Sequence, residues 1–454
     1  MLSALLGASS CRVKKYIPED ELLYTGSKID LTAETKVDQL SDIEEELETV
    51  MRPEPNSKIL GVRLGLLAHY KAQRKHPGLY YRFLNKKIGE EPVYLSDVNP
   101  LRVEELVNNR LENRGFFRSE ISSVEKKGKH TGSVKYTVHV DAPYTIKSYQ
   151  LDSGSLPIYK EISKYMNRSG FVKPGGRFDL ERFKVERDRI DFFLKDKGYY
   201  NFNADFLIFE ADTNGYNDKS VDLYLRLKRD VPHKSVIPYE VASINVFPHY
   251  SLNEGVKNDT VTLSGINYIQ DSAFFQPRRL APYILLEKGK RYNPTDSRRT
   301  SNRLSSIGSY KFVNIQYDEV GEANASDSLG QLATNIYLSP LKKRALRAEL
   351  QGVTKSNNFV GPSLSLTYSN RNLFRGGETL SATGKAGYEQ QLIKGDNTGL
   401  KSIQLGLKGD LVFPRLLFPV EIVRDFKYAV PKTKFSTGVE YLNRSKLYVL
   451  QSLT

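Results

Sequence analysis

Glu181 to Asn203 reads ERFKVERDRIDFFLKDKGYYNFN, which combines an amphipathic helix with a stop signal. Its apolar residues recur at the 3.6-residue spacing of one helix face, and they are Phe183, Ile190, Phe193 and Leu194. Gly198 comes next, and glycine at this position accepts the left-handed conformation that ends many helices. We therefore predict a helix that stops at Gly198-Tyr199-Tyr200, followed by alternating strands at 202–210 and 221–227.

The same succession of helix, glycine with aromatic residues, and alternating strands occurs three times. The three stops are Gly115-Phe116-Phe117, Gly198-Tyr199-Tyr200 and Gly308-Ser309-Tyr310. A strand and a first helix precede the second and third stops, at 144–151 with 158–166 and at 241–247 with 282–286. Each unit therefore has the order β-α-α-β-β, and the first unit carries an insertion at 51–94. The spacing of the units suits small independent domains.

Beyond Pro340 the periodicity changes, because apolar and polar residues alternate along the chain. The clearest runs are Leu364, Leu366 and Tyr368, and then Ile403, Leu405 and Leu407. Strands with one apolar face and one polar face are typical of a transmembrane β-barrel wall. We expect further strands at 344–354, 380–388, 435–441 and 446–450, with turns at 356–358, 375–377 and 394–397.

Several of these segments resemble one known family. The helix of Glu181 to Asn203 resembles the second helix of a POTRA domain, the polypeptide-transport-associated module. YNPTDSRRTSNRLSSIGSYKFVNI (292–315) resembles the POTRA domain that adjoins a barrel. GPSLSLTYSNRNLFRGGETLSATGKAGYE (361–389) resembles the start of the barrel in the BamA/TamA family of outer-membrane assembly proteins. Within it Arg371-Asn372-Leu373-Phe374 matches the family, whereas Arg375-Gly376-Gly377 only approximates the usual Gly-x-Gly.

The predicted fold is α+β: tandem POTRA domains followed by the N-terminal strands of a transmembrane antiparallel β-barrel. The expected parts are 1–11 as a lipoprotein signal remnant, 12–142, 143–236 and 237–341 as POTRA-like domains, and 342–454 as barrel strands. These strands are too few to close the barrel of that family, and an open edge in lipid leaves backbone groups unpaired. We therefore expect the sequence to be a fragment of a longer protein.

The resemblance implies a factor in the outer membrane of a Gram-negative bacterium, with its POTRA domains in the periplasm. Such a factor inserts or translocates outer-membrane proteins or lipids. The implied partners are unfolded outer-membrane protein clients, outer-membrane lipid and a periplasmic TamB-like protein. In this family extended clients add to POTRA sheet edges, and the barrel opens laterally at a seam. Three POTRA domains and an N-terminal cysteine indicate the TamA-like lipoprotein branch (TamL). A two-partner-secretion pore and a soluble periplasmic scaffold are the alternatives.

The single cysteine, Cys11, follows LSALLGASS, a short apolar segment that ends in small residues like a secretory signal before its cleavage site. This arrangement resembles a bacterial lipoprotein box, in which the cysteine becomes the lipid anchor. An ordinary buried cysteine is the alternative.

The formal net charge of +14 comes from basic residues spread along the whole chain beside acidic ones, which argues against a nucleic-acid partner. A local basic cluster lies where the first barrel strand is expected to begin, and it comprises Lys342, Lys343, Arg344 and Arg347. These side chains either contact anionic lipid headgroups or only add solubility.

Motifs for catalysis or metal binding are missing from the sequence. The six histidines are scattered without ligand spacing, and no nucleophile elbow is present. Gly128-Lys129-His130-Thr131 lacks the upstream glycine of a phosphate loop, so we predict a turn between strands. The carboxylates of Glu44, Glu45 and Glu46 are expected to be solvated on a helix surface. We expect no cofactor, no metal and no enzymatic activity.

Overall fold

The computed structural model describes residues 13–59, 61–74, 76–166, 170–216, 218–251, 259–270, 274–321, 328–392, 399–417 and 430–454. The chain divides into two compact units. One comprises Met1–Ile190 with Ala204–Lys228, and the other Asp191–Asn203 with Arg229–Thr454. Among the described residues, no helix is both long enough and apolar enough to cross a membrane.

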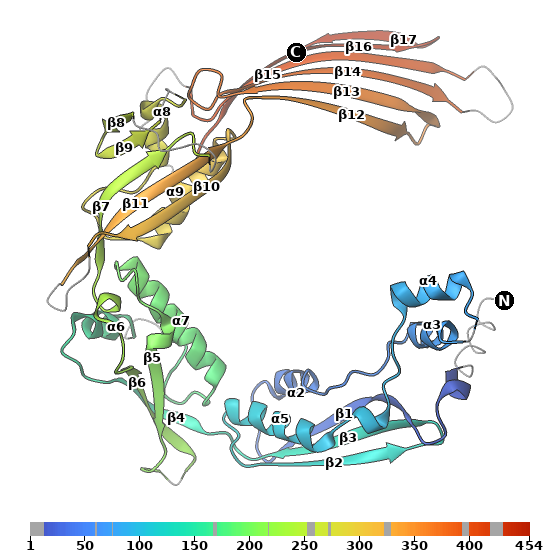
Figure 1. Cartoon of the computed structure of the whole chain (residues 1–454), viewed down its shortest axis with the longest axis vertical. Helices are drawn as coiled ribbons and strands as arrows, with labels where there is room; N and C mark the ends of the chain where they lie inside the picture. The colour runs from blue at the N-terminus through green and yellow to red at the C-terminus, as the bar shows by residue number, and fades with distance from the viewer. Residues whose placement is uncertain are drawn as a thin grey trace. The chain divides into compact units, whose positions relative to one another are not determined.

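The first α+β module has a three-stranded sheet with the order β1-β3-β2 (Figure 1). Its strands are β1 (Leu23–Ala33), β2 (Ser119–Lys127) and β3 (Thr131–Val140), with β1 parallel and β2 antiparallel to β3. Helices α2 (Leu40–Glu48) and α5 (Pro100–Asn113) cover one face of this sheet. Asn99 caps α5, because its side-chain oxygen accepts a hydrogen bond from the Arg102 amide at 3.1 Å. Gly128 begins the tight turn between β2 and β3, as predicted.

A helical insertion separates α2 from α5 in this module. It contains α3 (Leu64–Ala72), α4 (Leu79–Ile88) and the 3₁₀ turn η2 (Leu95–Asp97), and a further 3₁₀ turn, η1 (Lys14–Tyr16), precedes β1. Val13, Ile17 and Leu23 form a small core with Leu66 of α3, so the insertion has its own packing against the start of the chain.

The second α+β module repeats the topology, with the strand order β4-β6-β5. Its elements are β4 (Thr145–Leu151), α6 (Pro157–Met166), α7 (Leu180–Asp196), η3 (Ala204–Phe206), β5 (Leu207–Asp212) and β6 (Ser220–Leu227). Phe178 and Phe183 pack with Ile146, Val221 and Leu223 of the sheet. The strand predicted from residue 202 begins later than expected, because η3 occupies 204–206.

The third α+β module has a five-stranded sheet, with the order β10-β11-β7-β9-β8. Its elements are η4 (His233–Ser235), β7 (Tyr239–Phe247), β8 (Thr260–Leu263), β9 (Ile266–Ile269), α8 (Pro277–Leu280), η5 (Ala281–Tyr283), α9 (Pro294–Ser306), β10 (Tyr310–Glu319) and β11 (Gly330–Pro340). The helix predicted at 282–286 is placed too late, since the helical turns α8 and η5 cover 277–283. Pro282 fits the first turn of a helix but not its interior, which explains the break. The hairpin β8–β9 was not predicted.

The remaining strands form one antiparallel sheet in which each strand pairs with its neighbour in the chain. They are β12 (Arg344–Thr354), β13 (Phe359–Arg371), β14 (Thr379–Gln391), β15 (Lys401–Phe413), β16 (Thr433–Arg444) and β17 (Tyr448–Leu453), seen side by side in Figure 1. The turn predicted at 394–397 lies outside the described residues. The predicted fold class, POTRA-type α+β modules followed by consecutive barrel-type strands, is confirmed.

Candidate strand-edge and membrane-facing surfaces

The three helix-stop glycines adopt the left-handed conformation for which glycine was expected. The φ angles of Gly115, Gly198 and Gly308 are +89°, +104° and +79°. The aromatic residues beside them serve different purposes: Phe116 and Tyr199 are buried in their modules, whereas Phe117 is 43% exposed. Tyr310 begins β10 and is buried as well. Each stop therefore combines a required glycine with an aromatic side chain that fixes the end of the helix.

The first two stops are also joints to the next part of the chain. The Tyr144 amide donates to the Gly115 carbonyl at 2.9 Å, and the Phe178 amide donates to the Tyr144 carbonyl at 2.8 Å. The second stop repeats this pattern. The Tyr239 amide donates to the Gly198 carbonyl at 2.8 Å, and the Tyr292 amide donates to the Tyr239 carbonyl at 2.9 Å.

The third stop has a related hydrogen bond, which the Leu341 amide donates to the Ser309 carbonyl at 2.8 Å. It ties the stop of α9 to the residues that lead from β11 into β12. The helix-stop motifs found in the sequence thus lie where one module passes into the next.

An ion-pair cluster strengthens the first joint. Arg114 donates to the Glu46 carboxylate at 2.6 Å and to the Asp179 carboxylate at 2.9 Å. Asp179 is only 1% exposed and also caps α7 through the Glu181 amide at 3.0 Å. Burial alone would lower the pKa of Arg114, but the two carboxylates outweigh it and raise that pKa. Glu46 is therefore paired, and the expectation that it is simply solvated is wrong.

Aromatic packing strengthens the second joint. Tyr200 contacts Tyr239, Tyr292 and Tyr317, with ring centroids 5.9, 4.9 and 5.8 Å away. Burial, with a smaller effect of the nearby Glu319 carboxylate, raises the pKa of Tyr239 to about 12. These hydroxyls therefore stay neutral at physiological pH, and the joint carries no tyrosinate charge.

The three modules differ in how far their sheet edges are open. After its first residues, β1 has no strand partner on its outer edge within the described chain. At its start, the Leu22 carbonyl accepts from the Leu95 amide and the Tyr24 amide donates to the Val93 carbonyl. The start of β4 is covered by Gly175 to Arg177, and the described residues place no strand beside the rest of its outer edge. In the third module β9 pairs with β7 through Asn267 and Tyr268. The hairpin β8–β9 thus occupies the edge that corresponds to β1 and β4.

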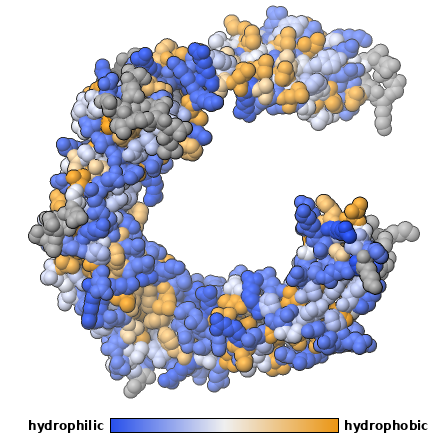
Figure 2. Space-filling view, in the orientation of Figure 1, coloured by the Kyte–Doolittle hydropathy of each residue, from blue (hydrophilic) through white to orange (hydrophobic). Residues whose placement is uncertain are grey.

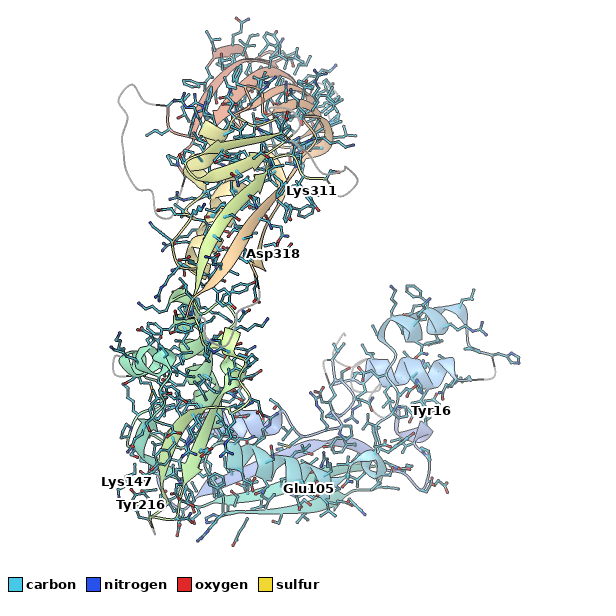
Figure 3. All side chains as sticks on the ribbon, turned by 60° about the vertical axis from the view of Figure 1, so that its left-hand side comes forward. Tyr16, Glu105, Lys147, Tyr216, Lys311 and Asp318 are labelled. Carbon is cyan, nitrogen blue, oxygen red and sulfur yellow. The ribbon has the colours of Figure 1, made fainter. Side chains whose placement is uncertain are left out.

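Charged residues lie on the opposite edge strand of the third module, β10. Figure 3 labels two of them, Lys311 and Asp318, on this strand. Charges on an edge strand oppose its pairing with another chain. The uncovered edges of β1 and β4 are candidates for strand addition, whereas the corresponding strand of the third sheet, β7, is covered by β9.

The sheet β12–β17 has one apolar face and one polar face. Residues paired across antiparallel strands share a face, so the register places Leu407 beside Gly384 and Val439. The exposed apolar side chains of this face include Leu346, Leu350, Leu364, Leu366, Tyr368, Ile403, Leu405, Leu407 and Val439. Leu350 is 77% exposed and Leu407 is 66% exposed. Figure 2 shows such apolar residues on the surface of this sheet.

The other face of the sheet is polar. Thr383 pairs with Lys408, and the neighbouring positions along and across the strands are also hydrophilic. A hollow of about 420 Å³ lies on this face, lined among others by Thr383, Lys385, Gln404, Lys408, Ser436 and Glu440. One face thus suits lipid and the other suits water, which is the division found in a barrel wall.

The predicted barrel hairpin docks on the third module. The Asn372 side chain donates to the Phe274 carbonyl at 2.6 Å, and its oxygen accepts from the Gly377 amide at 3.0 Å. At Gly377, with φ of +84°, an added Cβ would lie 2.5 Å from the Ile307 side chain. Gly376 donates to the Glu378 carboxylate at 2.9 Å, whereas Phe374 remains 56% exposed.

Glu378 and Arg415 form a buried ion pair beside this hairpin that the sequence did not reveal. Glu378 is 1% exposed and pairs with Arg415 at 2.8 Å. Tyr283 of the third module donates to the Pro414 carbonyl beside this pair. The two loops that contain Glu378 and Arg415 are therefore held together against η5. In the sequence, the position of Glu378 directly after Gly376 and Gly377 was the one feature that could have drawn attention to it. Its partner Arg415 could not be recognised, because it comes from a distant loop.

The basic cluster lies at the same end of the sheet as this hairpin. Lys342, Lys343, Arg344 and Arg347 are all exposed, and Arg347 pairs with Glu349. Arg371 bonds to the Lys342 and Lys343 carbonyls at 3.1 and 2.7 Å. The cluster thus marks the end of β12 that joins the third module. Arg347 pairs with Thr367 and lies on the polar face, so the prediction that it contacts lipid headgroups is wrong for this residue.

Two other sequence predictions concern sites with ligands. Cys11 lies outside the described residues. Among the residues that the structure does describe, no group of His, Cys, Asp or Glu side chains is arranged to hold a metal ion.

No protein-family model matches this chain, and no curated protein sequence matches it. Among solved structures, POTRA domains 3–5 of Haemophilus influenzae BamA match with 11% identity and a TM-score of 0.32, covering 71% of this chain and 99% of that one. Haemophilus ducreyi BamA lacking POTRA domains 1–3 matches with 13% identity and a TM-score of 0.35, covering 68% of this chain and 58% of that one.

CdiB from Acinetobacter baumannii matches with 10% identity and a TM-score of 0.27. The match covers 67% of this chain and 55% of CdiB. The chain thus spans little more than half the length of the Haemophilus ducreyi BamA and CdiB structures. The fold described above rests on the strand order and register of this chain itself.

Proposed function

We propose that this chain belongs to an outer-membrane assembly or translocation factor of the BamA/TamA type. Its α+β modules would receive extended clients in the periplasm, and its antiparallel sheet would form part of a barrel wall in the outer membrane. The observation that carries this proposal is the sheet β12–β17, whose apolar face is widely exposed and whose opposite face is polar.

Energetic reasoning supports a lipid environment for the apolar face. Leu346, Leu350 and Leu407 each leave most of their side-chain surface open. Apolar surface in water is unfavourable by roughly 25 cal/mol per Å², and a contiguous patch of this kind is rare on soluble proteins. Contact with acyl chains removes this penalty without any change in the sheet.

The open edges of β1 and β4 support a role in binding extended chains. A strand added to either edge would form main-chain hydrogen bonds, which require no particular client sequence. We propose that unfolded outer-membrane protein clients, or a periplasmic TamB-like partner, bind in this way. The β8–β9 hairpin would keep the third module out of this role and leave it to support the barrel strands.

We further propose that Cys11 is the acylated N-terminal residue of a lipoprotein and that the exposed cluster at Lys342, Lys343 and Arg344 contacts anionic headgroups. The first is supported by the sequence before Cys11, and the second by position beside the apolar face. Metabolic labelling with palmitate tests the first. Equal labelling of the wild type and of Cys11→Ala would contradict it.

Arginine substitutions on the two faces of β15 test the membrane role. Leu407 is the middle residue of β15 and lies on the apolar face, whereas Gln404 lies on the polar face beside Glu440. An arginine on the lipid face near the bilayer centre costs about 2–4 kcal/mol. In a protein that carries these strands within a complete barrel, we therefore expect Leu407→Arg to reduce refolding into phosphatidylcholine vesicles strongly, as measured by flotation, while Gln404→Arg does not.

The same experiment separates this function from that of a soluble scaffold. In a soluble β-sandwich Leu407 would not contact a bilayer, so refolding of the protein would not depend on vesicles. Vesicle-independent folding of the wild type, or equal effects of the two arginines, would contradict the proposal.

A further inference from the structure

The helical insertion of the first module carries an exposed apolar surface on α4. Leu79, Tyr80 and Phe83 are 83%, 67% and 62% exposed, and none of the residues of α4 is fully buried. With 3.6 residues per turn, Leu79 and Phe83 lie one above the other, and Tyr80 lies beside them. Tyr81 and Leu84, on the opposite side, are partly buried. The helix is thus held on one side and presents large apolar side chains on the other.

The charged residues of α3, α4 and the loop between them are all of one sign, although Glu90 and Glu91 follow just after α4. From Gly61 to Gly89 the sequence contains no Asp or Glu, while the basic residues are Arg63, Lys71, Arg74, Lys75, Arg82, Lys86 and Lys87. Arg82, Lys86 and Lys87 are exposed and flank the apolar residues of α4. Figure 2 shows strongly hydrophilic and hydrophobic residues side by side on the visible surface of this region.

The insertion is fixed at its base, so this surface is presented by a firm support. Leu66 of α3 is fully buried with Val13 and Ile17, and Tyr16, seen next to the helix pair in Figure 3, stacks on Tyr70 with ring centroids 5.5 Å apart. Where α4 ends, an added Cβ on Gly65 would lie 2.6 Å from the Ile88 carbonyl oxygen. The close approach of these backbones holds the two helices together.

Hydrogen bonds fix the return of the chain to the module. The Ser57 amide donates to the Glu90 carboxylate at 2.8 Å. The Asn56 side chain donates to the Glu91 carbonyl at 2.6 Å and accepts from the Val93 amide at 3.0 Å. The apolar residues of α4 are therefore not exposed through fraying of a loose segment.

We propose that α4 lies on the surface of an anionic phospholipid bilayer, with Leu79, Tyr80 and Phe83 in the headgroup region. Helices that lie in a membrane interface have apolar aromatic and aliphatic residues on one side and Lys or Arg on its flanks. A protein partner of mixed charge would be expected to meet acidic residues here as well as basic ones. The uniform positive charge instead matches the uniform negative charge of phosphatidylglycerol-type headgroups.

This contact would give the N-terminal module a membrane attachment separate from the barrel strands. It does not depend on acylation of Cys11. If Cys11 is acylated, the lipid would be attached two residues before Val13, which packs against α3.

A single tryptophan provides a local test, because the chain contains no Trp. Phe83→Trp places the reporter on α4 in the full-length chain. Phe171→Trp places a control reporter on an aromatic residue of similar exposure, 58%, in the second module. Quenching by phospholipids with brominated acyl chains is measured in two arms. In the first arm the chain is reconstituted into vesicles that contain the brominated lipid. In the second arm vesicles with the brominated lipid are added to the chain afterwards.

We expect the emission of Phe83→Trp to shift to the blue and to be quenched when the brominated vesicles contain phosphatidylglycerol. It should stay unchanged with phosphatidylcholine alone, and Phe171→Trp should not respond. Each basic residue near an anionic surface strengthens binding about fivefold. Arg82→Gln/Lys86→Gln/Lys87→Gln should therefore weaken partitioning to added vesicles roughly a hundredfold. The matched variant Lys126→Gln/Lys127→Gln/Lys129→Gln, with the same charge change on β2 and its turn, should not.

Absence of quenching in both arms overturns the proposal, as does quenching that is equal with and without phosphatidylglycerol. Equal responses of the two reporters would also overturn it. Circular dichroism of each variant in the absence of vesicles checks that the overall secondary structure of the chain is retained. Failure of β12–β17 to enter a bilayer would contradict the proposed function, but the arm with added vesicles would still test the contact of α4.

Discussion

Replacing Gly115 with alanine tests whether the helix-stop glycines act as joints. Gly115 has a φ of +89°, and an added Cβ would lie 2.6 Å from the Phe178 carbonyl oxygen. The unfavourable φ costs an alanine about 1 kcal/mol. The close contact is with backbone, which must move away. This movement weakens the hydrogen bonds from Tyr144 to Gly115 and from Phe178 to Tyr144. At about 1 kcal/mol for each bond, the loss at the joint totals about 3 kcal/mol.

Two other glycines of the same kind provide a graded comparison. At Gly308, with φ of +79°, an added Cβ would meet nothing within 4 Å, so Gly308→Ala should cost only the strain of about 1 kcal/mol. At Gly198 the Cβ would lie 3.2 Å from the Tyr239 carbonyl oxygen, which is tight but tolerable after a small shift. The predicted order of destabilisation is therefore Gly115→Ala, then Gly198→Ala, then Gly308→Ala.

Hydrogen–deuterium exchange of the full-length chain measures this effect where it occurs. Peptides that contain the Tyr144 and Phe178 amides should exchange roughly a hundredfold faster in Gly115→Ala, since 1.4 kcal/mol corresponds to a factor of ten. Gly308→Ala should leave these peptides unchanged. Unaltered protection in Gly115→Ala, or equally fast exchange of the same peptides in Gly308→Ala, would refute the reasoning.

Three further predictions concern the first two modules and their edges. Asp179→Asn should cost about 3 kcal/mol through loss of its buried arginine pair, and Asp179→Ala about 1 kcal/mol more, since it also removes the helix cap; chemical denaturation measures both. Burial opposes ionisation of Glu90, but hydrogen bonds from Ser57 and Asn56 keep the pKa of Glu90 below the ordinary 4.5. The stability that Glu90 contributes is therefore present above pH 4.5 and lost as the pH falls through the lower folded-state value. Acid should therefore reduce the protection factor of the Ser57 amide, after correction for the intrinsic exchange rate, but not in Glu90→Gln. A photo-crosslinking residue at Gln150 on β4 should capture an extended outer-membrane-strand peptide, whereas one at Asn245 on β7, which β9 covers, should not.

Each of these has a clear contrary outcome. Equal stabilities of Asp179→Asn and Asp179→Ala would show that the cap contributes nothing. An acid response that persists in Glu90→Gln would assign it to another group. Crosslinks at Asn245 as frequent as those at Gln150 would show that the β8–β9 hairpin does not protect the third sheet.

Features that depend on local periodicity were predictable from the sequence. The apolar spacing around Phe183 and Ile190 fixed the helix α7, and the glycine at 198 fixed its end. Alternation at Leu364 to Tyr368 and at Ile403 to Leu407 located β13 and β15 and assigned their apolar face. These predictions succeeded because side-chain direction follows directly from position in a helix or strand.

Only the tertiary structure decided which edges are open and which distant charges meet. The β8–β9 hairpin covers β7, and no local pattern distinguishes a strand that pairs with β7 from one that does not. The pairs Glu46–Arg114 and Glu378–Arg415 join residues far apart in the chain, and Glu46 looked like any solvated carboxylate. The exposed surface of α4 likewise depends on which side of the helix rests on α3. The sequence by itself determined the modules, the helix stops and the two-faced strands, because periodicity is local, whereas edge pairing and ion pairing depend on long-range register and packing.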